Sequence, residues 1–479
     1  MKISKKGKPK SKVFSFLENF TFSFVSNLLS LLVSIITILI VPKFLGVTQY
    51  GYWQLYLLYI SYAGVMQLGW CDGVYLRYGG AKYEDLNKRL ISSQFWYISI
   101  FYILFSLLLL VPIFSLKEFL NVQMVLWALV SGFITTPRGI LYYVLQATNR
   151  IKEFAKISII DRVVFGISLV ALLLMGFKDY HIVIASDLVG KLFAFGLSVY
   201  YCKDMVFVKL SNVYESIKEA KENLNAGFKL MVSNIASILI IGIVRFNIER
   251  NWGVEVFGKI SLTLSVSNLV MVFINAISII LFPMLRRVSN QQLPYIYRDI
   301  RTLLMVPILF MLLIYYPLKE LLLLWLPHYK EGIEYLALLF PLIVYESKMA
   351  LLINTYLKSL RKEKVMLIIN TFTVFLSLLT CFTTVYLINS IDITILSIVA
   401  LLAIRCVLAE LYIAKVLDIH VIKDIIFELL LNTVFIISGW LIGGEKGLCL
   451  YIIVVIIYLF LKRKDIINTF SSLKSLVSK

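Results

Sequence analysis

The stretch of sequence that decides the fold occurs twice. Residues 25–55 read VSNLLSLLVSIITILIVPKFLGVTQYGYWQL, and residues 232–262 read VSNIASILIIGIVRFNIERNWGVEVFGKISL. The copies align without gaps at an offset of 207 residues, and the matched positions of the first copy are Val25, Ser26, Asn27, Ser30, Leu32, Ile36, Gly46, Tyr50, Gly51 and Leu55. Each copy is a long apolar run, a glycine-containing turn and a second apolar run. This pattern predicts a pair of membrane-spanning helices joined by a short turn.

The composition of the whole chain requires a bilayer. Hydrophobic residues make up 60% of the 479 positions and charged residues only 16%, and the mean hydropathy is +0.87. A soluble domain is far less apolar. The formal net charge of +19 comes from Lys and Arg between the apolar runs, so we read it as a topology signal and expect no nucleic-acid partner.

Apolar segments of about 20 residues, the length that spans the hydrocarbon core, occur throughout the chain. We predict an all-α integral membrane protein with about fourteen helices, the first of them uncleaved. The expected spans lie near 20–41, 52–71, 93–114, 122–146, 157–177, 180–202, 229–248, 258–283, 302–326, 332–357, 365–388, 393–413, 425–443 and 447–461.

Lys and Arg concentrate in alternate loops, including both ends of the chain. The positive-inside rule therefore predicts a multi-pass protein with both termini in the cytoplasm. The repeat starts at a cytoplasmic end in both copies, so its halves are parallel. We expect two six-helix lobes around a central cavity, 1–202 and 229–413, a cytoplasmic linker at 203–228, and two further helices with a basic tail at 414–479.

Several chemistries are not expected. The five cysteines and three histidines are scattered, with no metal-ligand spacing, so we predict neither a metal nor a cofactor. The sequence from Gly253 to Ile260 approaches a phosphate-binding loop, but Ile260 replaces the hydroxyl residue, and we assign Gly253 and Gly46 to interhelical turns. The loops are too short for a soluble catalytic domain, so we do not expect an enzyme.

Charges within the predicted spans are the best pointers to a transport pathway, because a charge in the bilayer normally faces a bundle interior or a wet cavity. The cations are Arg138, Lys191, Arg245, Lys348 and Arg405, and the acids are Asp187, Glu346 and Glu410. The excess of cations suits an anionic passenger such as a diphosphate.

A purely structural interpretation stands beside this one. Asp187 and Lys191 are four residues apart and can neutralise each other on one helix face, as can Arg245 and Glu249. Lys348 and Arg405 have no carboxylate at that spacing, which favours them as cavity residues.

The segment from Val41 to Trp53, with Gln67–Trp70 and Arg77, resembles the start of the polysaccharide-biosynthesis flippases, and Arg245–Arg250 with Phe257–Lys259 resembles their seventh helix. The resemblance implies a multidrug/oligosaccharidyl-lipid/polysaccharide exporter of a bacterial cytoplasmic membrane. Its implied passenger is an undecaprenyl-diphosphate-linked oligosaccharide for capsule or O-antigen assembly.

The same resemblance implies site roles and partners. It adds Arg77 to the cavity cations, favours Arg245, and gives Asp187, Glu346 or Glu410 a role in proton or sodium coupling. The expected partners are the lipid-linked oligosaccharide, membrane lipids and a polysaccharide polymerase. Two other functions stay open: a multidrug cation antiporter of the same superfamily, which should have an acidic cavity, and a membrane scaffold without transport.

Overall fold

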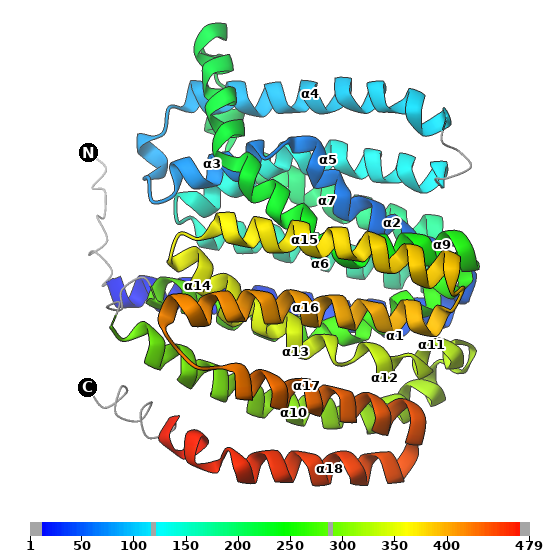
Figure 1. Ribbon diagram of the computed structural model, residues 1–479. Helices are drawn as coiled ribbons and strands as arrows, with labels where there is room; N and C mark the ends of the chain where they lie inside the picture. The colour runs from blue at the N-terminus through cyan, green and yellow to red at the C-terminus, as the bar shows by residue number, and fades with distance from the viewer. Residues whose placement is uncertain (1–11, 116–120, 286–290, 470–479) are drawn as a thin grey trace. The chain divides into compact units, whose positions relative to one another are not determined.

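The computed structural model describes residues 12–115, 121–285 and 291–469, and these are helical almost throughout (Figure 1). The lysines before residue 12 and the basic tail beyond residue 469, which entered the topology prediction, lie outside the described residues. Within these three described ranges, eleven helices are long and apolar enough to cross a membrane, or up to twelve if a bent pair at Pro327–Leu339 and Leu342–Ser359 is one span. The predicted all-α membrane fold is confirmed.

The contacts between residues divide the chain into two compact units. The first comprises the residues up to Ile36, Ala63–Phe177 and His181–Phe228, and the second comprises Thr37–Tyr62, Lys178–Tyr180 and the residues from Lys229 on. The second unit thus takes in residues 37–62, whereas the sequence 203–228 belongs to the first. The six-helix lobes expected at 1–202 and 229–413 stay a prediction.

The first unit contains most of α1 (Lys12–Leu45) and a set of helices that pack around α5. They are η1 (Gly64–Gln67), α3 (Trp70–Tyr78), η2 (Tyr83–Asp85), α4 (Lys88–Ser115), α5 (Val122–Ala147), α6 (Ile151–Leu174), α7 (Tyr180–Tyr201), α8 (Lys203–Val206) and the start of α9 (Val213–Leu285). Helix α5 packs against α3, α4 and α6. Asn121 caps α5, because its side chain accepts a hydrogen bond from the Met124 amide.

The second unit contains α2 (Val47–Ala63), the rest of α9 and the helices that follow. These are α10 (Leu293–Trp325), η3 (Pro327–Tyr329), α11 (Lys330–Glu334), α12 (Leu336–Leu339), α13 (Leu342–Ser347), η4 (Lys348–Ile353), α14 (Asn354–Ser359), α15 (Glu363–Cys381), η5 (Phe382–Leu387), α16 (Ile391–Leu417), α17 (Ile422–Ile436), η6 (Ile437–Ile442) and α18 (Gly444–Leu461). Helix α16 packs against α12, α13 and α15, and α18 packs against α10 and α17.

Helix α9 is one reason why the number of membrane-spanning helices counted in the described residues is smaller than the fourteen predicted spans. Its 73 residues would measure about 110 Å if straight, several times the thickness of a hydrocarbon core. Gly253, with φ +84°, breaks it between the predicted spans 229–248 and 258–283. Gly46, with φ +77°, separates α1 from α2 in the same way. Both glycines adopt a backbone conformation that other residues rarely reach, and the predicted turns are confirmed.

Candidate functional site

Five of the six predicted binding cations have a carboxylate partner in their own unit. In the first unit, Arg138 Nη1 lies 2.6 Å from Asp161 Oδ2, so helices α5 and α6 are joined by an ion pair. Lys191 Nζ lies 2.5 Å from Asp187 Oδ2 and donates to Ser131 Oγ at 2.9 Å. The pairing of Asp187 with Lys191 that the sequence left open is therefore present.

Arg77 lies at the end of α3 and reaches the beginning of α9. Its guanidinium pairs with Glu219, lies 2.6 Å from Glu222 Oε2 and donates to Asn223 Oδ1 at 2.6 Å. Tyr78 also donates to Glu219, at 2.7 Å. These contacts fasten the first turns of α9 to α3.

Arg405 on α16 donates hydrogen bonds to side chains of three other helices. It donates to Asn370 Oδ1 at 2.9 Å, to Ser237 Oγ at 2.7 Å and to Glu346 Oε1 at 3.2 Å. The partners come from α15, α9 and α13. The side chain thus links four helices, which periodicity along one helix does not reveal.

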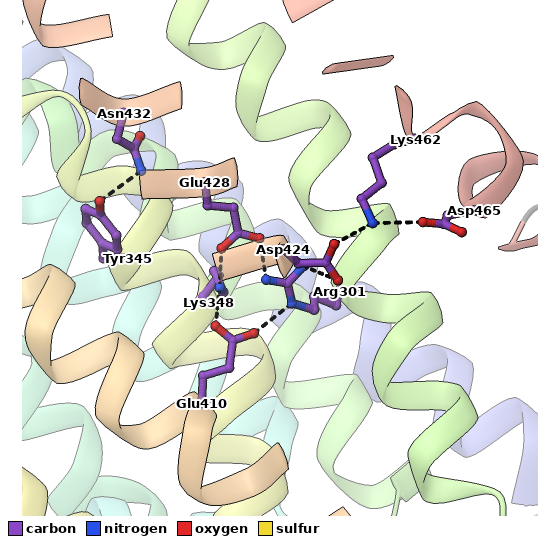
Figure 2. Close-up of polar contacts among 9 residues, drawn as sticks. All are labelled: Arg301, Tyr345, Lys348, Glu410, Asp424, Glu428, Asn432, Lys462 and Asp465. Atoms are coloured by element: carbon purple, nitrogen blue, oxygen red, sulfur yellow. Dashed lines mark hydrogen bonds and ion pairs between the residues drawn. The ribbon is translucent and has the colours of Figure 1, made fainter. Parts of the chain in front are cut away.

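Lys348 belongs to a network of seven charged residues, which Figure 2 shows in close-up. Its ammonium lies 2.5 Å from a carboxylate oxygen of both Glu410 and Glu428. Arg301 completes the ring, because its Nε lies 2.7 Å from Glu410 and its Nη2 lies 2.7 Å from Glu428. The four side chains are 5% exposed or less. Such a ring satisfies charges that would be very costly if unpaired.

The network continues outward and binds the last helices to the unit. Arg301 Nη1 lies 3.4 Å from Asp424 Oδ2, and Asp424 pairs in turn with Lys462 just after α18. Lys462 also pairs with the exposed Asp465, at 2.8 Å. Helices α10, α16 and α17 and the end of α18 are therefore connected by alternating charges.

Two members of this ring, Arg301 and Glu428, are not among the site residues predicted from the sequence. Arg301 lies just before the span expected at 302–326, so the sequence places it in a loop and not within the membrane. Glu428 lies within the span expected at 425–443, four residues after Asp424. A carboxylate within a predicted span is the sequence feature that could have identified it as a site residue. Lys348 begins a π-helical turn, η4, and the extra residue of a π-turn changes the direction of the side chains around it.

Arg245 on α9 is the exception among the predicted cations. Its Nη2 donates to Ser261 Oγ at 3.0 Å, and its guanidinium carbon lies 5.2 Å from the centre of the Phe257 ring. Its Nε is buried without a hydrogen-bond partner. Within the described residues no ion pair forms between it and a carboxylate, so the pairing with Glu249 that the sequence left open is absent.

The surroundings of Arg245 are hydroxyl-rich. The phenols of Tyr62 and Tyr50 lie close enough to interact with it electrostatically, and the Tyr62 hydroxyl is also buried without a partner. Tyr50 accepts a hydrogen bond from Gln54 Nε2 at 2.7 Å. A half-buried guanidinium with an unused donor and neutral neighbours favours an anion as its missing partner.

Apolar helices of membrane-spanning length, with buried charges paired between helices, define a polytopic α-helical membrane protein. The family model of polysaccharide biosynthesis proteins matches residues 81–324. The chain belongs to this family, as the sequence resemblance predicted.

Solved structures share the fold over nearly their whole length. One is the lipid II flippase MurJ in an inward closed conformation, with 15% identity, a TM-score of 0.64, and coverage of 94% of this chain and 99% of that chain. Another is an inward-facing multidrug resistance MATE family transporter of the MOP superfamily, with 11% identity, a TM-score of 0.62, and coverage of 82% and 98%.

A third is a MOP superfamily transporter from Pyrococcus furiosus, with 13% identity, a TM-score of 0.54, and coverage of 87% and 99%. At these identities the likeness establishes the fold and not the passenger. No curated protein sequence matches the chain.

Proposed function

We propose that this protein is a flippase that moves an undecaprenyl-diphosphate-linked oligosaccharide across a bacterial cytoplasmic membrane, for capsule or O-antigen assembly. The observation that carries the proposal is Arg245, a half-buried cation without a carboxylate among the described residues. A positive charge in this setting is costly unless an anion joins it. Arg245 is thus the group that meets the diphosphate during transport.

The chemistry of guanidinium suits a diphosphate. Its planar donors match two phosphate oxygens at once and replace the water stripped from them. Ser261 and Tyr62 stand beside Arg245 as neutral hydroxyl groups, which can donate to further phosphate oxygens without adding charge. A lipid-linked diphosphate would then be held by one strong cation and released when its environment changes.

A multidrug antiporter has the same fold, so the passenger must be inferred from the site. A cationic drug would be repelled by Arg245 and would require an unpaired carboxylate. The three acids predicted within the spans, Asp187, Glu346 and Glu410, each pair with a cation, so none of these three offers a cationic drug a free carboxylate. The fold of the solved transporters also supports transport in preference to enzymatic catalysis.

The other predicted cations are less suited to bind the substrate, because each already has a carboxylate partner. Arg77, Arg138, Lys191, Lys348 and Arg405 would bind substrate only by exchanging a carboxylate for a phosphate, and each exchange would leave a carboxylate unpaired. Ion coupling through Asp187, Glu346 or Glu410 would require the carboxylate to leave its cationic partner and bind a proton or a sodium ion instead. We propose that these pairs rearrange during alternating access, with a polysaccharide polymerase as a downstream partner.

The proposal is tested by complementing a deletion strain with wild type, Arg245→Ala and Arg245→Lys at matched protein levels. The expected result for Arg245→Ala is loss of surface polymer and accumulation of the lipid-linked unit on the cytoplasmic side. Arg245→Lys should keep part of the activity, because the charge remains but the fork of donors is lost.

The matched control is Arg298→Ala, which removes an exposed arginine of α10 and should leave polymer export unchanged. Normal polymer in the deletion strain, without a second flippase, would rule out the proposed passenger. Cationic-drug sensitivity of the same strain would then favour the antiporter.

A further inference from the structure

The first turns of α9, residues 213–228, form a helix with a packed face and an exposed apolar face. One face, with Ser216, Glu219, Asn223 and Gly227, is buried within the first unit. The backbone contact there is tight, because a Cβ on Gly227 would lie 1.9 Å from the Gly69 carbonyl oxygen. This packing and the ion pairs of Arg77 fix the rotation of the helix about its axis.

The second face is apolar and exposed. Its side chains, which are between 51% and 77% exposed, are Val213, Tyr214, Ile217 and Phe228. At about 100° per residue they lie on one side of the helix, next to the packed face. Phe207 and Leu210, just before the helix, are exposed to a similar degree. An apolar stripe of this kind requires a partner.

Positive charge accompanies the apolar face. At about 100° per residue, Lys221 falls within this face and Lys218 at its edge, and Lys209 lies just before the helix. Lys209, Lys218 and Lys221 are exposed, and no ion pair forms with them among the described residues. The nearby acids are engaged elsewhere: Glu219 and Glu222 pair with Arg77, and Glu215 accepts a hydrogen bond from Ser211 at 2.7 Å. The surface available to a partner is therefore apolar and cationic.

We infer that residues 207–228 lie in the headgroup region of the membrane and bind anionic phospholipids. Helix α4 is a candidate membrane span, and Figure 1 shows the first turns of α9 running across the direction of α4. A helix crosswise to a span lies along the membrane surface. Its apolar face enters the acyl boundary, and its lysines meet phosphate groups.

This assignment does not depend on the passenger that the protein moves. The segment 207–228 directly precedes the point where the chain passes from the first unit to the second, between Phe228 and Lys229. Binding of residues 207–228 to the membrane surface would make transport sensitive to the anionic lipid content of the leaflet.

The experiment places an environment-sensitive fluorophore on Ile217→Cys in the full chain, with Cys449→Ser removing the one cysteine that is exposed. The protein is reconstituted in nanodiscs of phosphatidylcholine alone or mixed with phosphatidylglycerol. Lipids spin-labelled near the headgroup should quench the fluorophore about twofold more in the mixed nanodiscs. Lys209→Gln with Lys218→Gln and Lys221→Gln should abolish that difference.

Two controls keep the result specific. The same fluorophore on Glu215→Cys, on the polar side of the helix, should be quenched by aqueous iodide and little by the lipid. Lys82→Gln with Lys156→Gln and Lys364→Gln removes three exposed lysines elsewhere and should keep the phosphatidylglycerol effect. A fluorophore at position 217 that stays accessible to iodide in both nanodiscs would overturn the inference and leave the face to a protein partner.

Discussion

Gly51 on α2 and Gly258 on α9 lie in backbone contact, and they are equivalent positions of the internal repeat. A Cβ on Gly258 would lie 2.8 Å from the Cα of Gly51, and one on Gly51 would lie 2.3 Å from the Val254 carbonyl oxygen. A contact between equivalent residues is what a two-fold relation between the two copies produces. The repeat therefore accounts for this packing contact between α2 and α9.

Replacing either glycine by alanine should destabilise the protein, because the added methyl group meets backbone atoms that cannot turn away. Overpacking of this kind costs about 1–3 kcal/mol. The melting temperature of purified Gly51→Ala and Gly258→Ala in detergent should fall. Gly196→Ala is the control, because nothing lies within 4 Å of its added Cβ; an equal loss in all three variants would argue against the contact.

Neutralising one charge of the buried ring should lower the free energy of unfolding more than removing one positive and one negative charge together. Glu410→Gln leaves Lys348 and Arg301 to share Glu428, and breaking a buried pair costs about 3–5 kcal/mol. Adding Lys348→Met removes the excess positive charge and should recover much of the stability. Denaturation midpoints of the single and double variants check this, and a double variant no more stable than Glu410→Gln would contradict it.

The extent to which sequence predicts this protein differs between backbone and side chains. Apolar length places the spans, and the repeated glycines place the turns at Gly46 and Gly253, because both signals are local. Ion-pair partners are not local: Arg405 binds groups from three other helices. Spacing along one helix gives Lys348 and Arg405 no carboxylate partner and gives Arg245 a possible one in Glu249. In the structure Lys348 and Arg405 are paired, and no ion pair forms with Arg245 among the described residues.

Arg77→Ala should loosen the first turns of α9. The guanidinium holds Glu219, Glu222 and Asn223 together, and no other cation pairs with Glu219 among the described residues. Amide hydrogen exchange in residues 213–228 should become faster, while exchange in α5 stays unchanged. Arg89→Ala, which removes an exposed arginine of α4, is the matched control and should leave both segments as in wild type.

Asp204 should give the fold a small acid sensitivity. Burial alone would raise the pKa of its carboxyl, but hydrogen bonds from Lys88 and Tyr83 outweigh that effect and lower the pKa below 3.8. A lowered folded-state pKa means that the contribution is present above the unfolded pKa and is lost as pH falls through the folded pKa. Because the pair is partly exposed, the contribution should stay below about 1 kcal/mol.

The measurement for Asp204 compares the melting temperatures of wild type and Asp204→Asn as pH is lowered from neutrality. The advantage of wild type should shrink only as pH falls below 3.8. An advantage that is constant across this range would show that the carboxylate charge contributes nothing there.

The missing carboxylate at Arg245 leads to the sharpest prediction, because it can be supplied from within the chain. Ser261 Oγ already accepts a hydrogen bond from Arg245 at 3.0 Å, so Ser261→Asp would place an anion where the proposed diphosphate binds. The internal ion pair offsets the cost of burying the new carboxylate, so folding should be retained while polymer export falls by tenfold or more. Ser261→Asn has the same size as Ser261→Asp, adds no charge and still offers a hydrogen-bond donor to phosphate, so export should fall much less, measured as surface polymer in the deletion strain. If both variants export normally at equal protein levels, Arg245 does not need to be unpaired for transport, and the positive charge acts only in packing.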